Sequence, residues 1–356
     1  MRGERRRAAG GQQPRGTETS AGVLFLTPHS SALTPRRSPS LTPRSSPLVS
    51  APSPFAVSHS SLLSTHSLPL DPTRLSFSTA CLANHSLEEA ADVGRELGFR
   101  GIELLAFDGY RHSQGDLAGF YFDRMTTAEK DRLLRLVAPF EHVSTHAPFI
   151  DISLFAPNPG VRDEAFRQIV VAIEATAFLG GSTTTAHVCG KSGHGFEEYR
   201  SEIVDTFRRL GDRAGAAAIT LTIETGYPVG VEAFAGLIHD IGHSAVGANV
   251  DVGHLVGYLP PEAKGTTEGP ERYRQTLMAQ LEALGDKVYH VHLHDVRESD
   301  FRDHRAVGRG FLDYGAIMRW CAHAGYEGLF ALELEEPDMV PALKASKAAI
   351  EAARSE

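Results

Sequence analysis

The segment VYHVHLHDV, residues 288–296, alternates apolar and histidine side chains along a run typical of a β-strand. Successive side chains of a strand point to opposite faces. Tyr289, Val291 and Leu293 therefore share one face, which is apolar enough to pack against helices. The opposite face carries three histidines of one parity, namely His290, His292 and His294. We expect this polar face to point into a barrel.

Two further strand-like runs repeat the alternation and place acidic groups on the inward face. In LFALELE, residues 329–335, Glu333 and Glu335 lie opposite the apolar side chains. In ITLTIET, residues 219–225, Glu224 likewise lies on the face opposite the apolar Leu221 and Ile223. The inward faces of three strands thus carry groups that bind metal ions or exchange protons.

Strand-like and helix-like segments alternate eight times from Asp71 onward. Strict alternation implies parallel strands joined by helical crossovers. Eight such units predict an α/β fold, a single-domain (β/α)8 TIM barrel over residues 71–356. A doubly wound open sheet is the second choice, but it would not bring all the polar strand ends together. The predicted strands are 75–82, 101–107, 142–149, 182–188, 219–225, 246–252, 288–296 and 329–335.

Residues 1–70 have a different composition, rich in Ser, Pro, Thr and Arg and without apolar periodicity. Such a segment cannot bury enough surface to offset the entropy of ordering, so we expect a disordered extension. Two explanations stay open. One, which we favour, is an upstream extension with no role in folding; the other is an organellar transit segment.

Charge and cysteine content exclude several classes of protein. Residues 1–70 contain eight Arg and two acidic residues, Glu4 and Glu18, and so have a net charge of +6. Since the whole chain has a net charge of −9, residues 71–356 have a net charge of −15. An acidic folded part disfavours nucleic acid as a partner, since phosphate backbones are bound by clustered Lys and Arg. Three cysteines without a CxxC pair indicate neither a disulfide framework nor a thiolate zinc site.

No apolar stretch reaches the roughly 18 residues of a membrane span. We therefore expect a soluble protein without membrane contact. The expected compartment is the cytoplasm, or an organelle if residues 1–70 are a transit segment.

Four side chains at the ends of the last four predicted strands form the leading candidate site. Three carboxylates and one imidazole make an oxygen-rich donor set that suits Mn, Mg, Co or Zn. A divalent ion there would polarise a carbonyl and stabilise an enediolate when a neighbouring proton is removed. Since two glutamates can exchange that proton, Glu224 and Glu333 are the predicted catalytic pair. The predicted metal ligands are Glu224, Asp251, His292 and Glu333.

A second set of histidines follows other strand ends, and its role is open between additional metal ions and hydrogen bonds to substrate. It comprises His146, His187, His254 and His304. His294 lies near the expected rim of the barrel, and its contact with substrate is left open. His290 lies one layer deeper and is expected to be structural. The loop HRAVGRG, residues 304–310, offers Arg305 and Arg309 for an anionic group, or is simply solvated.

Taken together, these motifs resemble the xylose-isomerase-like barrel superfamily, which includes sugar and sugar-phosphate isomerases and epimerases and the endonuclease-IV-type apurinic nucleases. The resemblance covers about residues 75–352 and is carried by STHAPF, AHVCG, TIETG, NVDVGH, VHLHD and LELE. The epimerase branch implies one divalent ion on the four ligands and an acid/base pair of Glu224 and Glu333. It also implies that His254 and an arginine of the 304–310 loop position the substrate.

The nuclease branch implies three zinc ions, held by the four ligands, the second set of histidines and one further aspartate. That aspartate would stand two residues before His304, where this sequence has Arg302. Asp303 is shifted from the expected place by one residue. The sequence therefore departs from the pattern at the third ion.

We expect a metal-dependent isomerase or epimerase of a small sugar, sugar phosphate or related polyol. A zinc-dependent apurinic-type endonuclease or phosphodiesterase is the alternative. A cyclitol-dehydratase-like lyase or a non-catalytic binding barrel is the third choice. The expected partner is a small molecule, and because barrels of this group often pair, a homo-oligomer is an open expectation.

Overall fold

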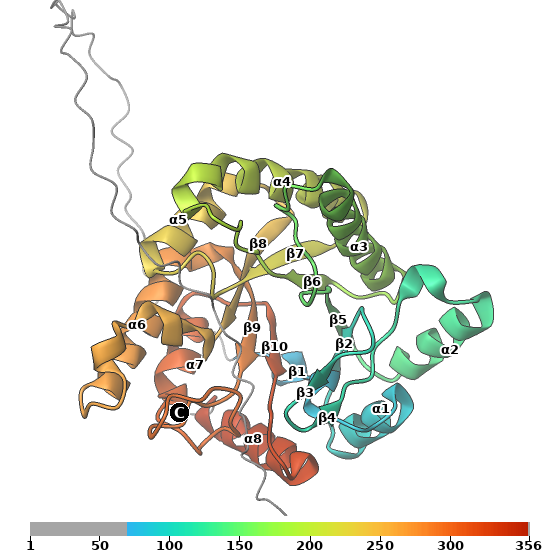
Figure 1. Cartoon of the computed structure of the whole chain (residues 1–356). Coiled ribbons are helices and arrows are strands. Elements are labelled where there is room, and N and C mark those ends of the chain that lie inside the picture. Colours follow the sequence, from blue (N-terminus) through green and yellow to red (C-terminus); the bar gives the residue numbers. More distant parts are fainter. Residues whose placement is uncertain (1–69, 355–356) are drawn as a thin grey trace, which may run out of the picture. The chain divides into compact units, whose positions relative to one another are not determined.

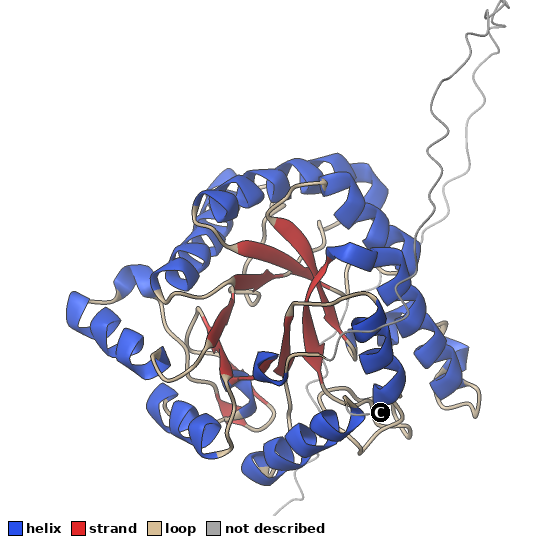
Figure 2. Cartoon of the chain, turned by 180° about the vertical axis from the view of Figure 1, so that it is seen from behind, coloured by secondary structure: helices blue, strands red, loops and turns tan. Residues whose placement is uncertain are grey.

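A computed structural model describes residues 70–354 of the chain. Eight strands form a closed parallel barrel with helices packed around its outside (Figure 1 and Figure 2). They are β1 (Leu75–Ser78), β2 (Gly101–Leu105), β5 (His142–His146), β6 (Thr183–Ala186), β7 (Thr220–Glu224), β8 (Val246–Asp251), β9 (Val288–Leu293) and β10 (Leu329–Leu332). The ring order is β1-β10-β9-β8-β7-β6-β5-β2, so strands that follow one another along the chain are neighbours in the ring. The predicted (β/α)8 TIM barrel is confirmed.

Within the described residues, one α-helix follows each barrel strand. The first two helices are capped by Ser86 and Thr126, whose hydroxyls accept the backbone N–H of a glutamate three residues on, while the glutamate side chain accepts the backbone N–H of the cap. The helices are α1 (Leu87–Glu96), α2 (Thr127–Val137), α3 (Pro159–Phe178), α4 (Phe196–Ala216), α5 (Val231–Ile241), α6 (Gly269–Leu284), α7 (Tyr314–His323) and α8 (Met339–Ala353). None of the helices in this part of the chain has the length and apolar character needed to cross a bilayer. The predicted extension, apart from Leu70, falls outside the described residues.

The apolar core lies between the ring of strands and the helices. Phe77 of β1 is fully buried, and its ring centroid lies 5.1 Å from that of Phe99 and 6.3 Å from that of Phe140. Gly94 of α1 lies directly above this ring, where any larger side chain would clash with it. The glycine thus lets α1 approach the barrel closely.

A polar layer fills the barrel interior below the strand ends. The hydroxyls of Thr185 and Thr222 lie 3.1 Å apart, and the Asn249 amide donates to Thr185 at 3.4 Å. All three side chains are fully buried. This layer is therefore held together by hydrogen bonds among its side chains, although Oδ1 of Asn249 has no hydrogen-bond partner.

Most barrel strands end two to four residues earlier than the sequence predicts, and the chain beyond them forms the loops of the barrel mouth. The polar loop 108–125 contains a short hairpin of β3 (Arg111–His112) and β4 (Gly115–Asp116). The last barrel strand ends at Leu332 rather than at residue 335. The reason is that the N–H of Glu335 bonds to the carbonyl of His304 at 2.8 Å, in a loop and not in the neighbouring strand.

Replacing Phe77 by Ala should destabilise the barrel by about 3–5 kcal/mol, because a fully buried aromatic ring leaves a cavity. Phe178→Ala is the matched control, since that ring is 40% exposed. Urea denaturation of both variants measures the difference. Equal losses of unfolding free energy would contradict the described core.

Candidate metal centre

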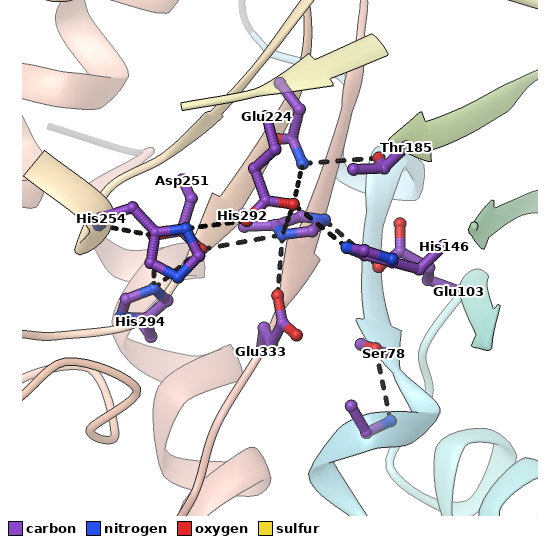
Figure 3. Close-up of polar contacts among 12 residues, drawn as sticks. Ser78, Glu103, His146, Thr185, Glu224, Asp251, His254, His292, His294 and Glu333 are labelled. Carbon is purple, nitrogen blue, oxygen red and sulfur yellow. Dashed lines mark hydrogen bonds and ion pairs between the residues drawn. The ribbon is translucent and has the colours of Figure 1, made fainter. Parts of the chain in front are cut away.

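The four predicted metal ligands converge at the carboxyl ends of adjacent strands. Glu224 ends β7, Asp251 ends β8, His292 lies one residue before the end of β9, and Glu333 directly follows β10. One ligand atom from each lies within 4.8 Å of the corresponding atoms of the other three. Figure 3 shows the side chains of Glu224 and Glu333 directed toward the imidazole of His292. The four residues thus meet the distance requirement for sharing one cation.

His292 lies at the centre of this group. Its Nδ1 atom lies 2.7 Å from Glu333 Oε2, 3.6 Å from Glu224 Oε2 and 3.7 Å from Asp251 Oδ2. The ring is fully buried, and neither of its nitrogens has a well-aligned hydrogen-bond partner. A buried nitrogen of this kind, surrounded by carboxylate oxygens, fits a divalent cation.

Glu224 also contacts three histidines of the second set. Its Oε2 atom lies 3.2 Å from the Nε2 atoms of both His146 and His187, and Oε1 lies 2.9 Å from Nδ1 of His254. His146, His187 and Glu224 form a further group whose ligand atoms lie within 4.8 Å of one another. Glu224 therefore belongs to two candidate cation groups at once.

His294 supports Asp251 and does not reach the opening. Its Nδ1 atom accepts the backbone N–H of His304 at 2.9 Å, so Nε2 carries the ring proton. Nε2 then donates to the two carboxylate oxygens of Asp251, at 2.8 and 3.0 Å. Since His294 is fully buried, this geometry favours a positioning role over the substrate contact that the sequence left open.

A third group joins the loop that follows β9 to His254, which follows β8. His254, Asp303 and His304 offer ligand atoms within 4.8 Å of one another, and Asp303 Oδ1 lies 3.2 Å from His304 Nδ1. Asp303 thus reaches the histidine pair although it is one residue away from the position expected from the nuclease pattern. Both Phe301 and His304 have positive φ angles, 56° and 55°, and these irregular turns set the path of the loop.

Two buried carboxylates hold this loop in place. Asp295 accepts the backbone N–H groups of Val296, Gly308 and Leu312 at 2.9–3.1 Å. Glu336 accepts the N–H of Ala306 at 2.9 Å. Neither role is visible in the sequence, because it depends on backbone groups that only the folded loop brings to these carboxylates.

The arginines of the 304–310 loop lie outside the convergent group. Arg305 and Arg309 both pair with Glu336, at 3.5 and 3.3 Å. The side chain of Arg309 is 62% exposed. The structure therefore does not bring Arg309 to the four ligands, and its proposed contact with an anionic substrate stays a prediction.

An aromatic wall covers one side of the site. The ring of Phe149 stacks on His187, with centroids 5.1 Å apart and planes inclined by 21°. Phe107 and Tyr110 pack edge-on against the same phenylalanine. The wall thus packs against the rings of His146 and His187.

One further interior carboxylate, Glu103 of β2, was not predicted from the sequence. It is fully buried and lies within 3.2 Å of both His290 and His292. Its signal was present in GIELLAF, where one acidic residue interrupts an apolar strand. His290, expected to be structural, contacts Glu103 and lies outside the four-ligand group.

Mutual charge compensation keeps the buried acids ionised. Burial alone would raise the pKa of Glu224, but the charges of His187 and His292 hold it well below its ordinary value. For a histidine, burial has the opposite effect and lowers the pKa. The Asp303 carboxylate nevertheless raises the pKa of His304 to about 9. The pKa of His292 is also raised well above its ordinary range, against the effect of burial, by Glu103, Glu333 and Glu224. The metal-free centre therefore holds protons on histidines that a cation must displace.

Because the metal-free centre carries protons on its histidines, its thermal stability and its affinity for zinc should change in opposite directions with pH. Since the folded-state pKa of His304 lies above its ordinary value of 6.5, its stabilisation is complete below about pH 6.5 and is lost as pH rises through about 9. The Tm of the metal-free protein should fall over this range, while zinc affinity should rise. Calorimetry and chelator competition at several pH values measure both. A Tm that stays level or increases would contradict the assignment.

Comparison with known proteins supports the assignment of the fold. The family model described as xylose isomerase-like TIM barrel matches residues 91–356. Among curated proteins, none matches the chain.

Solved structures share the fold at low sequence identity. A D-tagatose 3-epimerase-like protein is 17% identical with a TM-score of 0.59, covering 78% of this chain and 98% of its own. A xylose isomerase-like barrel from Mycobacterium smegmatis in complex with magnesium is 15% identical, with a TM-score of 0.60 and coverages of 79% and 96%. A protein from Thermus thermophilus, soaked with zinc chloride, is 21% identical, with a TM-score of 0.53 and coverages of 79% and 97%. Because the family model spans most of the chain and the barrel is closed as that family requires, the chain belongs to the xylose isomerase-like TIM barrel family.

Proposed function

We propose that this protein is a metal-dependent isomerase or epimerase of a small sugar, sugar phosphate or related polyol. The observation that carries the proposal is the group of Glu224, Asp251, His292 and Glu333 at the barrel mouth. Three carboxylates and one imidazole suit Mn, Mg, Co or Zn, and the four residues would hold such an ion together. When bound, the ion would polarise a substrate carbonyl and so acidify the neighbouring C–H group.

The two glutamates differ in exposure in a way that assigns them different roles. The side chain of Glu333 is 18% exposed, whereas that of Glu224 is 1% exposed. Glu333 therefore faces the opening and is our candidate for the base that removes the substrate proton. Its pKa is lowered, against the effect of burial, by the charge of His292, which keeps the carboxylate ready to accept a proton. Glu224 is the candidate for returning the proton from the opposite side.

Partly exposed histidines and the acidic charge favour a small polyhydroxylated substrate. The side chains of His187 and His254 are 27% and 24% exposed, so part of each imidazole is accessible to a substrate. The charge of −15 over residues 71–356 disfavours a polyanionic partner. The likeness to a D-tagatose 3-epimerase-like structure supports the same substrate class.

Glu333→Gln should lower kcat by about 10²–10⁴-fold with little change in the bound metal, because the amide keeps a donor oxygen but cannot accept the proton. Glu335→Gln is the matched control, since that residue lies at the rim beside Arg302 and Ser113. A panel of ketoses and sugar phosphates, combined with elemental analysis, measures both effects. Parent-level turnover by Glu333→Gln would overturn the assigned role.

A second candidate function is a zinc-dependent phosphodiesterase of the apurinic-nuclease type. The specific observation in its favour is that Glu224 belongs to two candidate cation groups while His254, Asp303 and His304 form a third. Three adjacent cations would suit phosphoryl chemistry, in which attacking and leaving oxygens both carry charge. The acidic charge of the barrel weighs against a nucleic-acid substrate and favours a small phosphodiester.

Metal stoichiometry separates these functions. One ion per chain, unchanged by Asp303→Asn, is expected for the isomerase. Two to three zinc ions, with one lost in Asp303→Asn, are expected for the phosphodiesterase, together with hydrolysis of bis(p-nitrophenyl) phosphate. Asp300→Asn is the matched control, because Asp300 lies in the same loop and pairs with Arg297. A protein that binds no ion and turns over no sugar would support a binding barrel instead.

A further inference from the structure

The buried carboxylate of Glu103 lies across the barrel from the strand that carries His292. Glu103 Oε1 lies 3.2 Å from His292 Nε2, and Oε2 lies 3.0 Å from His290 Nε2. Ser144 donates its hydroxyl to Oε2 at 3.0 Å. All four side chains are buried from solvent, so no water competes for these contacts.

The two nitrogens of His292 consequently face different environments. Nε2 faces Glu103, and Nδ1 faces the ligand oxygens of Glu333, Glu224 and Asp251. A neutral imidazole has one N–H group and one lone pair. An ionised carboxylate accepts hydrogen bonds and cannot donate one, so once a cation lies among the oxygens on the Nδ1 side, the carboxylate of Glu103 favours the proton on Nε2.

We propose that Glu103 is a positioning residue that keeps the proton of His292 on Nε2 and so presents the Nδ1 lone pair to the divalent ion. The inference rests on the proposed metal site and assigns a role to a residue outside its ligand group. Carboxylates that hold the remote nitrogen of a metal-bound histidine fix both the ring orientation and the protonated nitrogen. Glu103 does so from a strand that is not adjacent to β9 in the ring.

The alternative is a cation held by Glu103, His290 and His292 themselves, whose ligand atoms also lie within 4.8 Å of one another. That arrangement needs the lone pair of His292 on Nε2. If a second ion bound Nδ1 at the same time, the imidazole of His292 would carry no proton on either nitrogen. A neutral imidazole does not readily lose its remaining proton. The oxygens of Glu103 lie 3.0 and 3.2 Å from Nε2 of His290 and of His292, ion-pair distances at which a carboxylate stabilises a proton on the ring nitrogen, although the N–H groups are not aligned with the oxygens. The geometry favours the positioning role.

Substitution of Glu103 by Gln should weaken zinc binding by about 10–100-fold, the usual effect of losing such a partner. The amide can donate to Nε2 and thereby shift the ring proton to Nδ1, where it blocks the ion. Affinity is measured on the full chain by competition with a chromophoric chelator. Ser144→Ala is the matched control, because it removes a bond to the other oxygen of Glu103 in the same buried layer. An affinity within about threefold of the parent is expected for it.

A spectroscopic measurement on the unsubstituted protein tests the inference even if Glu103→Gln fails to fold. In protein labelled with ¹⁵N-histidine and loaded with ¹¹³Cd, the one-bond coupling should appear at Nδ1 of His292, with a proton on Nε2. The resonances are assigned by their loss in His292→Asn. Coupling at Nε2 would overturn the proposal and support a cation at Glu103.

Failure of this inference is distinguishable from failure of the proposed function. If the parent protein binds no divalent ion, the metal site itself is wrong. If the parent binds zinc and Glu103→Gln binds it equally well, the site stands and the role of Glu103 is wrong. An equal loss in Ser144→Ala would assign the effect to packing of the layer and would also overturn the role.

Discussion

Buried acids and histidines at the barrel mouth depend on one another's charge. Glu224, Asp251 and Glu103 are almost completely removed from water, and an isolated carboxylate in such surroundings would not stay ionised. Each has at least one imidazole nitrogen within 3.2 Å. The closed ring makes this compensation possible, because only a barrel points the inward side chains of all its strands at a common axis.

Support for the candidate ligands is arranged in successive layers. Asp251 is held by His294, which is itself held by the backbone of His304. His292 is flanked by Glu103, which is held by Ser144. Beneath them lies the layer of Thr185, Thr222 and Asn249. Such layers restrict side-chain rotation before any ion binds, so less entropy is lost when the ligands close on it.

The loop after β9 adds the feature that separates the two candidate functions. Asp303 joins His254 and His304 only because two positive-φ residues turn the backbone and because Asp295 and Glu336 tie down the loop. A count of residues from His304 placed Arg302 where an acidic ligand was expected, and spacing alone argued against a third cation group. Spacing along an irregular loop is a poor guide to distance, since the dihedral angles of each residue redirect the chain.

The sequence by itself determined the fold and pointed to the four candidate ligands that converge at the barrel mouth. Alternation in VYHVHLHDV and LFALELE indicated which side chains point inward, because the period of a strand is two. Eight strand–helix units favoured a closed parallel barrel over an open sheet. The ends of the elements were less well determined, as the early end of β10 illustrates. Only the tertiary structure decided that Glu103 faces His292, that His294 supports Asp251, and that Arg309 pairs with Glu336 away from the site. These contacts join residues far apart in the chain across the barrel or through loop backbone, and no local pattern encodes such distances.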